Sequence, residues 1–137
     1  MSLYCSVKTQ FKNQDALVAA LMETGKWQVN QIDVYDVAQN LFGYKGDQRK
    51  EVAHIIIRRE SVGRSANDMG FVRNPDGTYS AIISEYDKRK YNDAWLKQLR
   101  GNYAYHAIRL QQAARGRSVS RERMSDGSQR VRVKGYR

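Results

Sequence analysis

The chain has 137 residues, of which 41% are hydrophobic, and a single cysteine, Cys5. This length is enough for one hydrophobic core, and we predict a single domain over residues 1–137. A lone cysteine excludes an internal disulfide. No apolar run approaches the roughly 18–20 residues that a membrane-spanning helix needs, and the first residues do not resemble a signal peptide. We therefore expect a cytoplasmic protein with no membrane partner.

Positive charge is concentrated in the last fifty residues. Residues 1–87 carry ten Lys and Arg against eleven Asp and Glu, a net charge of −1. Residues 88–137 carry fourteen against three, so this segment accounts for the formal net charge of +10. Such asymmetry indicates an anionic partner, namely a nucleic acid, a nucleotide or an acidic protein.

The first half of the chain alternates strand-like and helix-like patterns. Asn13 or Asp15 can cap a helix that Gly25 ends. An unbroken apolar centre predicts that the strand after residue 51 is buried on both faces. The predicted elements are a strand over 2–9, a helix around 16–22, a strand near 27–34, an extended arm with a turn over 36–50, and a strand over 52–59.

The middle of the chain contains a loop and a hairpin. Residues 60–67 are small and polar, and we expect a mobile loop there. Asn74-Pro75-Asp76-Gly77 separates two apolar segments, residues 69–73 and 78–83. Proline presets φ for a turn and glycine accepts a positive φ, so these segments are predicted to form a hairpin. A basic connector follows over residues 86–91.

A long helix and a final hairpin make up residues 92–137. The helix begins near Asn92 or Asp93, and Gly116 ends it. Gly101 interrupts the helical pattern and predicts a kink or close packing. Strands over 118–124 and 129–134 flank a turn at 125–128. The apolar stripe of the helix is predicted to consist of Trp95, Leu99, Tyr103, Ala107 and Leu110.

These elements predict an α+β fold. Their order is β-α-β, a β meander, a long helix and a β hairpin. The turns favour a mainly antiparallel sheet with two helices on one face, which is a two-layer sandwich.

Residues that could carry catalysis are few. Of the two histidines, His54 lies in an apolar strand and is expected to be packed and hydrogen-bonded, and neither has the spacing of a metal pair. The acids occur singly, and Asp33 and Asp87 are predicted at surface and loop positions. Gly43-Tyr44-Lys45-Gly46 matches the spelling of an RNA-clamping loop, but an ordinary turn is favoured. We expect no enzymatic activity, no metal and no cofactor.

The terminal hairpin is the stronger candidate for a binding site. Alternation places Arg130, Arg132 and Lys134 on one face of their strand. Arginines on the paired strand and on the long helix could extend one basic surface, and tyrosines supply rings for stacking, as in single-stranded nucleic acid binding. The predicted ligand-binding residues are Arg100, Tyr105, Arg109, Arg117, Arg121, Arg123, Arg130, Arg132 and Lys134, with Arg137 and Tyr136 at the chain end.

Several short motifs occur together in one order. They are Val7-Lys8-Thr9-Gln10, Asp15-Ala16-Leu17, Gly43-Tyr44-Lys45-Gly46, Asp68-Met69-Gly70-Phe71, the Asn-Pro-Asp-Gly turn, Leu99-Arg100-Gly101-Asn102-Tyr103-Ala104-Tyr105-His106 and Asp126-Gly127-Ser128. In this the chain resembles the small uncharacterised conserved-reading-frame family of plastids and cyanobacteria, which also occurs in other bacteria and in phages. The resemblance implies the fold and transfers no catalytic residue. The closing hairpin departs from the family in being strongly basic, and residues 60–67 look like an insertion.

Two functions are consistent with these features. The first is a non-enzymatic binding protein that holds a nucleic acid or a phosphorylated small ligand through the basic residues of 92–137. The alternative is a protein-interaction or inhibitor module, which could be encoded by a phage and act on a host protein, or a homo-oligomer built on exposed strand edges.

Overall fold

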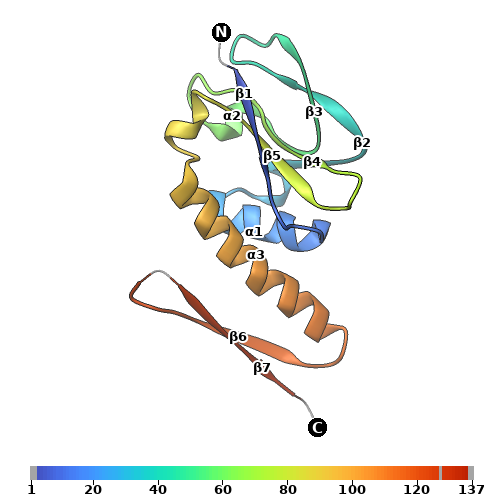
Figure 1. Cartoon of the computed structure of the whole chain (residues 1–137), viewed down its shortest axis with the longest axis vertical. Helices are drawn as coiled ribbons and strands as arrows, with labels where there is room; N and C mark the ends of the chain where they lie inside the picture. The colour runs from blue at the N-terminus through green and yellow to red at the C-terminus, as the bar shows by residue number, and fades with distance from the viewer. Residues whose placement is uncertain (1–2, 127, 136–137) are drawn as a thin grey trace.

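The computed structural model describes residues 3–126 and 128–135. Ser2 of the first predicted strand, Gly127 of the last turn, and Tyr136 and Arg137 lie outside the described residues. The elements are β1 Tyr4–Lys8, α1 Gln14–Gly25, the 3-10 turn η1 Val29–Gln31, β2 Ile32–Phe42, β3 Gln48–Ile57, α2 Arg59–Val62, β4 Met69–Arg73, β5 Tyr79–Ser84, the 3-10 turn η2 Asp87–Arg89, α3 Asp93–Ala113, β6 Ser118–Arg123 and β7 Gln129–Lys134 (Figure 1).

Five strands form the main sheet in the order β1-β5-β4-β3-β2, and every neighbouring pair is antiparallel. The predicted Asn-Pro-Asp-Gly hairpin is confirmed, because Arg73 pairs with Tyr79 and Gly77 has a φ of 87°. The predicted α+β class and the mainly antiparallel sheet are likewise confirmed. Among the described residues, no helix is long and apolar enough to cross a membrane.

The strand predicted near residues 27–34 begins later than expected. Gln28 and Gln31 cap each other across η1, and the Gln31 side chain accepts a hydrogen bond from the Gln28 N–H at 2.9 Å. Trp27 turns into the core instead of joining a strand and is only 6% exposed. The arm predicted over 36–50 is the remainder of β2, a turn and the first part of β3. The Gly43–Gly46 segment is therefore a turn between two strands, as favoured from the sequence.

Helices α1 and α3 cover one face of the sheet, and the main core lies between them. Leu17 and Leu21 of α1 and Leu99 of α3 are fully buried there against strand residues such as Phe71 and Ile83. As predicted, Asn13 and Asn92 cap the two helices through side-chain oxygens.

The predicted apolar stripe of α3 is correct only in part. Leu99 is buried, and Trp95 and Tyr103 pack against the core, but the buried face runs through Leu96, Leu99 and Asn102. The predicted stripe continues to Ala107 and Leu110, past the part of α3 that the sheet covers. Figure 1 shows α3 continuing beyond the sheet, where the β6–β7 hairpin lies beside it.

The opposite face of the sheet is covered by the β2–β3 ribbon itself. Between two paired positions β2 advances from Val34 to Gln39 while β3 moves only from Ile55 to Ala53, so the ribbon is bulged. It packs Leu41 and Ala53 against Ile56 and Ile82 in a second core. A side chain at Gly70 would place its Cβ 2.4 Å from that of Ala53, so glycine is required for this approach.

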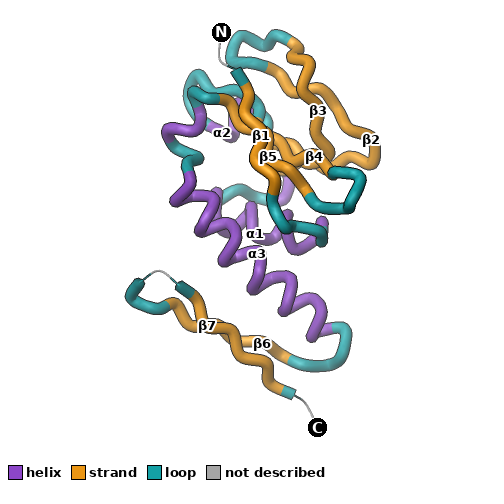
Figure 2. Tube along the Cα trace, viewed as in Figure 1, coloured by secondary structure: helices purple, strands orange, loops and turns teal. Residues whose placement is uncertain are grey.

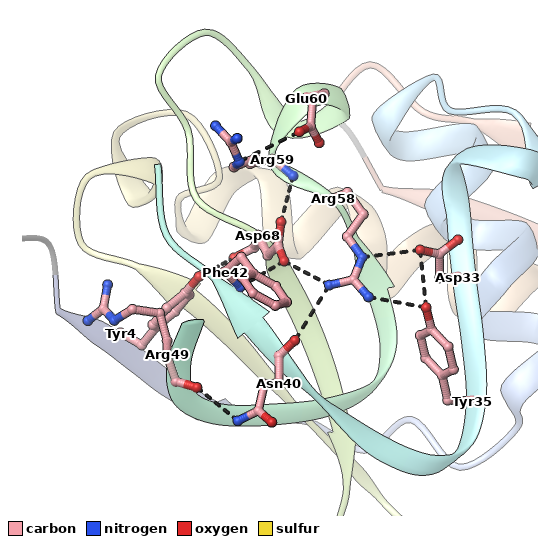
Figure 3. Close-up of polar contacts among 10 residues, drawn as sticks. All are labelled: Tyr4, Asp33, Tyr35, Asn40, Phe42, Arg49, Arg58, Arg59, Glu60 and Asp68. Atoms are coloured by element: carbon pink, nitrogen blue, oxygen red, sulfur yellow. Dashed lines mark hydrogen bonds and ion pairs between the residues drawn. The ribbon is translucent and has the colours of Figure 1, made fainter. Parts of the chain in front are cut away.

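Asp68 and Arg58 hold the folded ribbon in place (Figure 3). The carboxylate of Asp68, which is 1% exposed, accepts hydrogen bonds from the N–H groups of Phe42 at 2.8 Å and Arg59 at 2.7 Å. It also accepts one from Arg58 Nη1 at 2.9 Å. Arg58 donates in addition to Asp33 and to the Tyr35 hydroxyl near the start of β2, and to the Asn40 carbonyl near its end. One guanidinium therefore joins both ends of β2 to Asp68, the residue before β4.

The expectation of a mobile loop over residues 60–67 is wrong. The segment begins in α2 and ends in Ala66 and Asn67, both buried. Asn67 donates from its backbone to the carboxylate of Asp87 at 3.0 Å, and the Ser84 hydroxyl donates to the same oxygen at 2.7 Å. Asp87 is thus 5% exposed instead of lying at the surface, because its hydrogen bonds are made inside the fold.

The β6–β7 hairpin is a separate two-stranded sheet on the far side of α3 from the main sheet (Figure 2). The two strands predicted for this hairpin are confirmed. They form a further layer outside the two layers, sheet and helices, that the sequence predicts. The hairpin approaches α3 closely at Gly101, since a Cβ there would lie 2.9 Å from the Gln129 amide nitrogen. The close packing predicted at Gly101 is confirmed.

Replacing Asp68 by asparagine tests the ribbon lock. The variant leaves Arg58 without its buried counter-charge and places an amide against backbone donors, so the free energy of unfolding should fall by about 3 kcal/mol. Urea unfolding measures this loss. Glu60→Gln is the control, because it removes an exposed ion pair with Arg59 and should change stability by about 0.5 kcal/mol or less. Equal losses in the two variants would contradict the assignment.

Candidate anion-binding surface

Among the described residues, one carboxylate holds the inner face of the β6–β7 hairpin against the helices. It belongs to Glu23, in the last turn of α1. Its Oε2 accepts from Nη2 of Arg121 and from Nη2 of Arg123, both at 2.6 Å. Its Oε1 lies 2.8 Å from Nε2 of His106 on α3. Burial raises the pKa of Glu23, but the hydrogen bonds from Arg121 and His106 outweigh it and bring the pKa below its ordinary value. Glu23 is therefore ionised and joins three elements.

Asn102 is the second docking residue and is buried beneath the hairpin. Its amide nitrogen donates to the Thr24 hydroxyl at 2.8 Å. Its carbonyl oxygen accepts from Gln129 at 3.0 Å and from Arg121 at 3.2 Å. The guanidinium of Arg121 also lies 3.9 Å above the ring centroid of Tyr105, a cation–π contact. The hairpin is thus attached mainly by polar contacts.

Both ring nitrogens of His106 are engaged. Nδ1 lies 3.2 Å from Nε of Arg109 and accepts its hydrogen bond, which leaves the proton of the neutral ring on Nε2, facing Glu23. Burial and the charges of Arg109 and Arg121 lower the pKa of His106, and the hydrogen bond to Glu23 opposes them without reversing the direction. A histidine so bound has no free nitrogen with which to take a substrate proton. We assign it a positioning role.

The arginines of the two strands do not form one surface. Arg121 pairs with Val131, and Glu122 pairs with Arg130. Because residues opposite each other in an antiparallel pair share a face, Arg121 and Arg123 lie on the inner face with the valines. The expected single surface with Arg130 and Arg132 is therefore not formed, and the guanidinium of Arg121 is held by Glu23, Asn102 and Tyr105.

The outer face of the hairpin presents Arg130, Arg132 and Lys134. All three are exposed, and within the described residues none of them has an acidic partner within ion-pair distance. Alternation spaces them about 6.6 Å apart along β7. The sequence prediction that these three share one face of β7 agrees with the register.

A groove of about 580 Å³ runs between α3 and the turn of the hairpin. Lys97, Arg100 and Arg123 line it, together with Met124 and Asp126. The Asp126 carboxylate accepts hydrogen bonds from Ser128, which lower its pKa. Lys97 and Arg100 therefore face the Asp126 carboxylate, while the charge of Arg123 is already paired with Glu23. The groove thus brings together the predicted residues Arg100 and Arg123.

The remaining predicted residues lie apart from both regions. Arg109 binds His106, and Tyr105 lies under Arg121. Arg117 lies beyond the end of α3, with its guanidinium 3.4 Å from the side-chain oxygen of Gln112. Glu23 was missed, although an acid in the last turn of a helix is disfavoured by the helix dipole and so indicates a nearby cation.

Acidification should loosen this network. His106 keeps a depressed pKa in the folded protein, so below its ordinary pKa of about 6.5 the unfolded chain takes up the proton first and stability falls. The urea midpoint should therefore drop between pH 7.5 and 5.5, and His106→Gln should reduce that drop. Burial also lowers the pKa of His54, near Arg73, so the variant should keep part of the pH dependence. An unchanged pH dependence in His106→Gln would contradict the assignment.

Comparison with known proteins gives one match. Residues 29–132, from η1 into β7, match the family model described as a protein of unknown function (DUF1257). No curated protein and no solved structure matches the chain. The matched segment covers the β2–β3 ribbon, the Arg58–Asp68 lock, α3 and most of the hairpin, and it leaves out β1 and α1. The chain therefore belongs to the DUF1257 family, the uncharacterised family that the sequence motifs led us to expect.

Proposed function

We propose that the protein binds nucleic acid through the outer face of the β6–β7 hairpin. The observation that carries the proposal is the row of three exposed cations, Arg130, Arg132 and Lys134. They share their face with one acid of the described residues, Glu122 opposite Arg130, and no ion pair within 4.0 Å joins the two, so the face keeps a net positive charge. Arginine and lysine contact phosphates through charge-assisted hydrogen bonds, and such contacts supply most of the affinity for a polyanion. A row of evenly spaced cations suits a chain of phosphates.

The shape of this face favours a polymer over a small ligand. The hollow next to Arg130 and Arg132, which Glu122 and Arg121 also line, has a volume of about 190 Å³. Pockets that enclose small ligands measure roughly 300–1,000 Å³. The groove with Lys97 and Arg100 lies at the turn end of the same hairpin and offers further cations to a strand that continues past β7. No catalytic step is part of the proposal.

Fluorescence anisotropy with labelled single-stranded DNA, RNA and duplex DNA over a salt series tests this function. Binding should weaken steeply with salt. The triple variant Arg130→Gln/Arg132→Gln/Lys134→Gln should bind about tenfold more weakly or worse at low salt, and its log–log salt slope should be shallower by about 2.

The matched control removes the same charge elsewhere. Lys12, Lys45 and Lys50 are exposed on other parts of the surface, and their triple glutamine variant should retain nearly all of the affinity. The proposal fails if the wild-type protein does not bind any of the three nucleic acids at low salt, or if the two triple variants lose affinity equally.

A protein-interaction role is a second candidate, favoured by the edge of the main sheet. β2 is the terminal strand in the sheet order, and Val37 on it is 74% exposed. An edge strand with exposed apolar residues can pair with another chain. If this edge joins two copies, light scattering at high micromolar concentration should give a dimer mass that Val37→Lys reduces to that of a monomer. A monomer for the wild-type chain would remove the homo-oligomer.

A further inference from the structure

A second basic site lies just before the N-terminus of α3, where the chain leads into that helix. The segment after α2 and the segment that leads into α3 run side by side, as Figure 1 shows, and form an open pocket of about 350 Å³. Val62 and Arg64 line it from the first segment, and Tyr86, Arg89, Lys90 and Tyr91 line it from the second. These residues are distinct from the hairpin surface proposed to bind nucleic acid.

The pocket is rich in cations. Arg64, Arg89 and Lys90 all line it, and none of the ion pairs among the described residues involves them. The single acid in the lining, Asp87, is 5% exposed and accepts from Asn67 and Ser84 inside the fold. Three positive charges thus meet one buried negative charge, which leaves a net attraction for an anion.

Part of the pocket wall is held by contacts within the protein. The Tyr91 hydroxyl donates to the carbonyl oxygen of Val62 at 2.6 Å and joins the two segments. Arg89 donates from Nε to the carbonyl of Tyr86 at 3.1 Å, and its guanidinium lies 4.0 Å above the centroid of the Tyr86 ring. A site whose side chains are already held loses less conformational entropy on binding.

The chemistry of the lining selects the ligand. Guanidinium groups match the planar geometry of two phosphate oxygens, and the ammonium of Lys90 adds a point charge. The volume is at the lower end of the range for small-molecule pockets. Tyr86, which is 40% exposed, adds an aromatic residue to the lining.

We propose that this pocket binds the terminal phosphate of a small phosphorylated molecule, of about the size of a mononucleotide. This site goes beyond the proposed nucleic-acid function and uses none of its residues. A terminal phosphate could also belong to the end of a nucleic acid strand, and the experiment below separates the two sources.

Amide NMR titration of the full chain with AMP tests the site, with adenosine and inorganic phosphate as comparison ligands. AMP and inorganic phosphate should shift the amides of residues 63–66 and 87–91, and adenosine should not. Arg64→Gln/Lys90→Gln should weaken AMP binding by about tenfold or more. Arg130→Gln/Arg132→Gln, which removes the same charge from the hairpin, should bind AMP as the wild-type protein does.

Three results would overturn the proposal. The first is the absence of shifts at these amides up to ~10 mM AMP. The second is an equal loss of AMP affinity in the two double variants, which would indicate a general charge effect. The third is binding of a 5′-phosphorylated oligonucleotide at these amides without any binding of AMP, which would assign the pocket to strand ends. Each result can occur whether or not the hairpin binds nucleic acid, so the two proposals fail separately.

Discussion

The buried pair of Arg58 and Asp68 is the constraint on which the fold depends. Only Ile55–Ile57 of β3 pair with β4, so most of the long β2–β3 ribbon extends past the regular sheet. Its backbone groups and apolar residues still need partners, and the ribbon obtains them by folding over the second face. Asp68 accepts a hydrogen bond from the N–H of Phe42 at the end of β2, and the positive charge of Arg58 compensates the charge of the buried carboxylate. A carboxylate can be buried this deeply because its hydrogen bonds and the opposite charge of Arg58 offset the cost of removing it from water.

Signals that act within one turn of the chain were readable from the sequence. Asn13 and Asn92 cap their helices, the Asn-Pro-Asp-Gly turn forms its hairpin, and Gly101 marks a close approach. The two caps and the turn depend on neighbours a few residues away, whereas Gly101 indicates a close approach without specifying its distant partner, Gln129. The segment at 60–67 was misjudged because its order comes from distant partners. A polar residue such as Asn67 is typical of a loop until Asp87, twenty residues later, is known to lie against it.

The candidate site likewise combines features that local sequence predicts with features that depend on distant contacts. Alternation along β7 correctly grouped Arg130 with Arg132. Their relation to β6 depends on the pairing register, which the turn at 125–128 already implies, since it sets Arg121 opposite Val131. Alternation along one strand alone does not separate the inner arginines of β6 from the outer ones of β7. The contact of Arg121 with Glu23 could not be inferred, because nothing local specifies which side of α3 the hairpin covers.

The docking carboxylate also has an evolutionary consequence. Glu23 belongs to α1, outside the segment that matches the family model, whereas Arg121 and Arg123 lie inside it. One anion holds two guanidinium groups about a hundred residues away, so the loss of any member changes what the others contribute. In relatives, substitutions at these three positions should be correlated. Members that lack an acid at the position of Glu23 would then have either neutral residues at both arginine positions or a hairpin released from the helices.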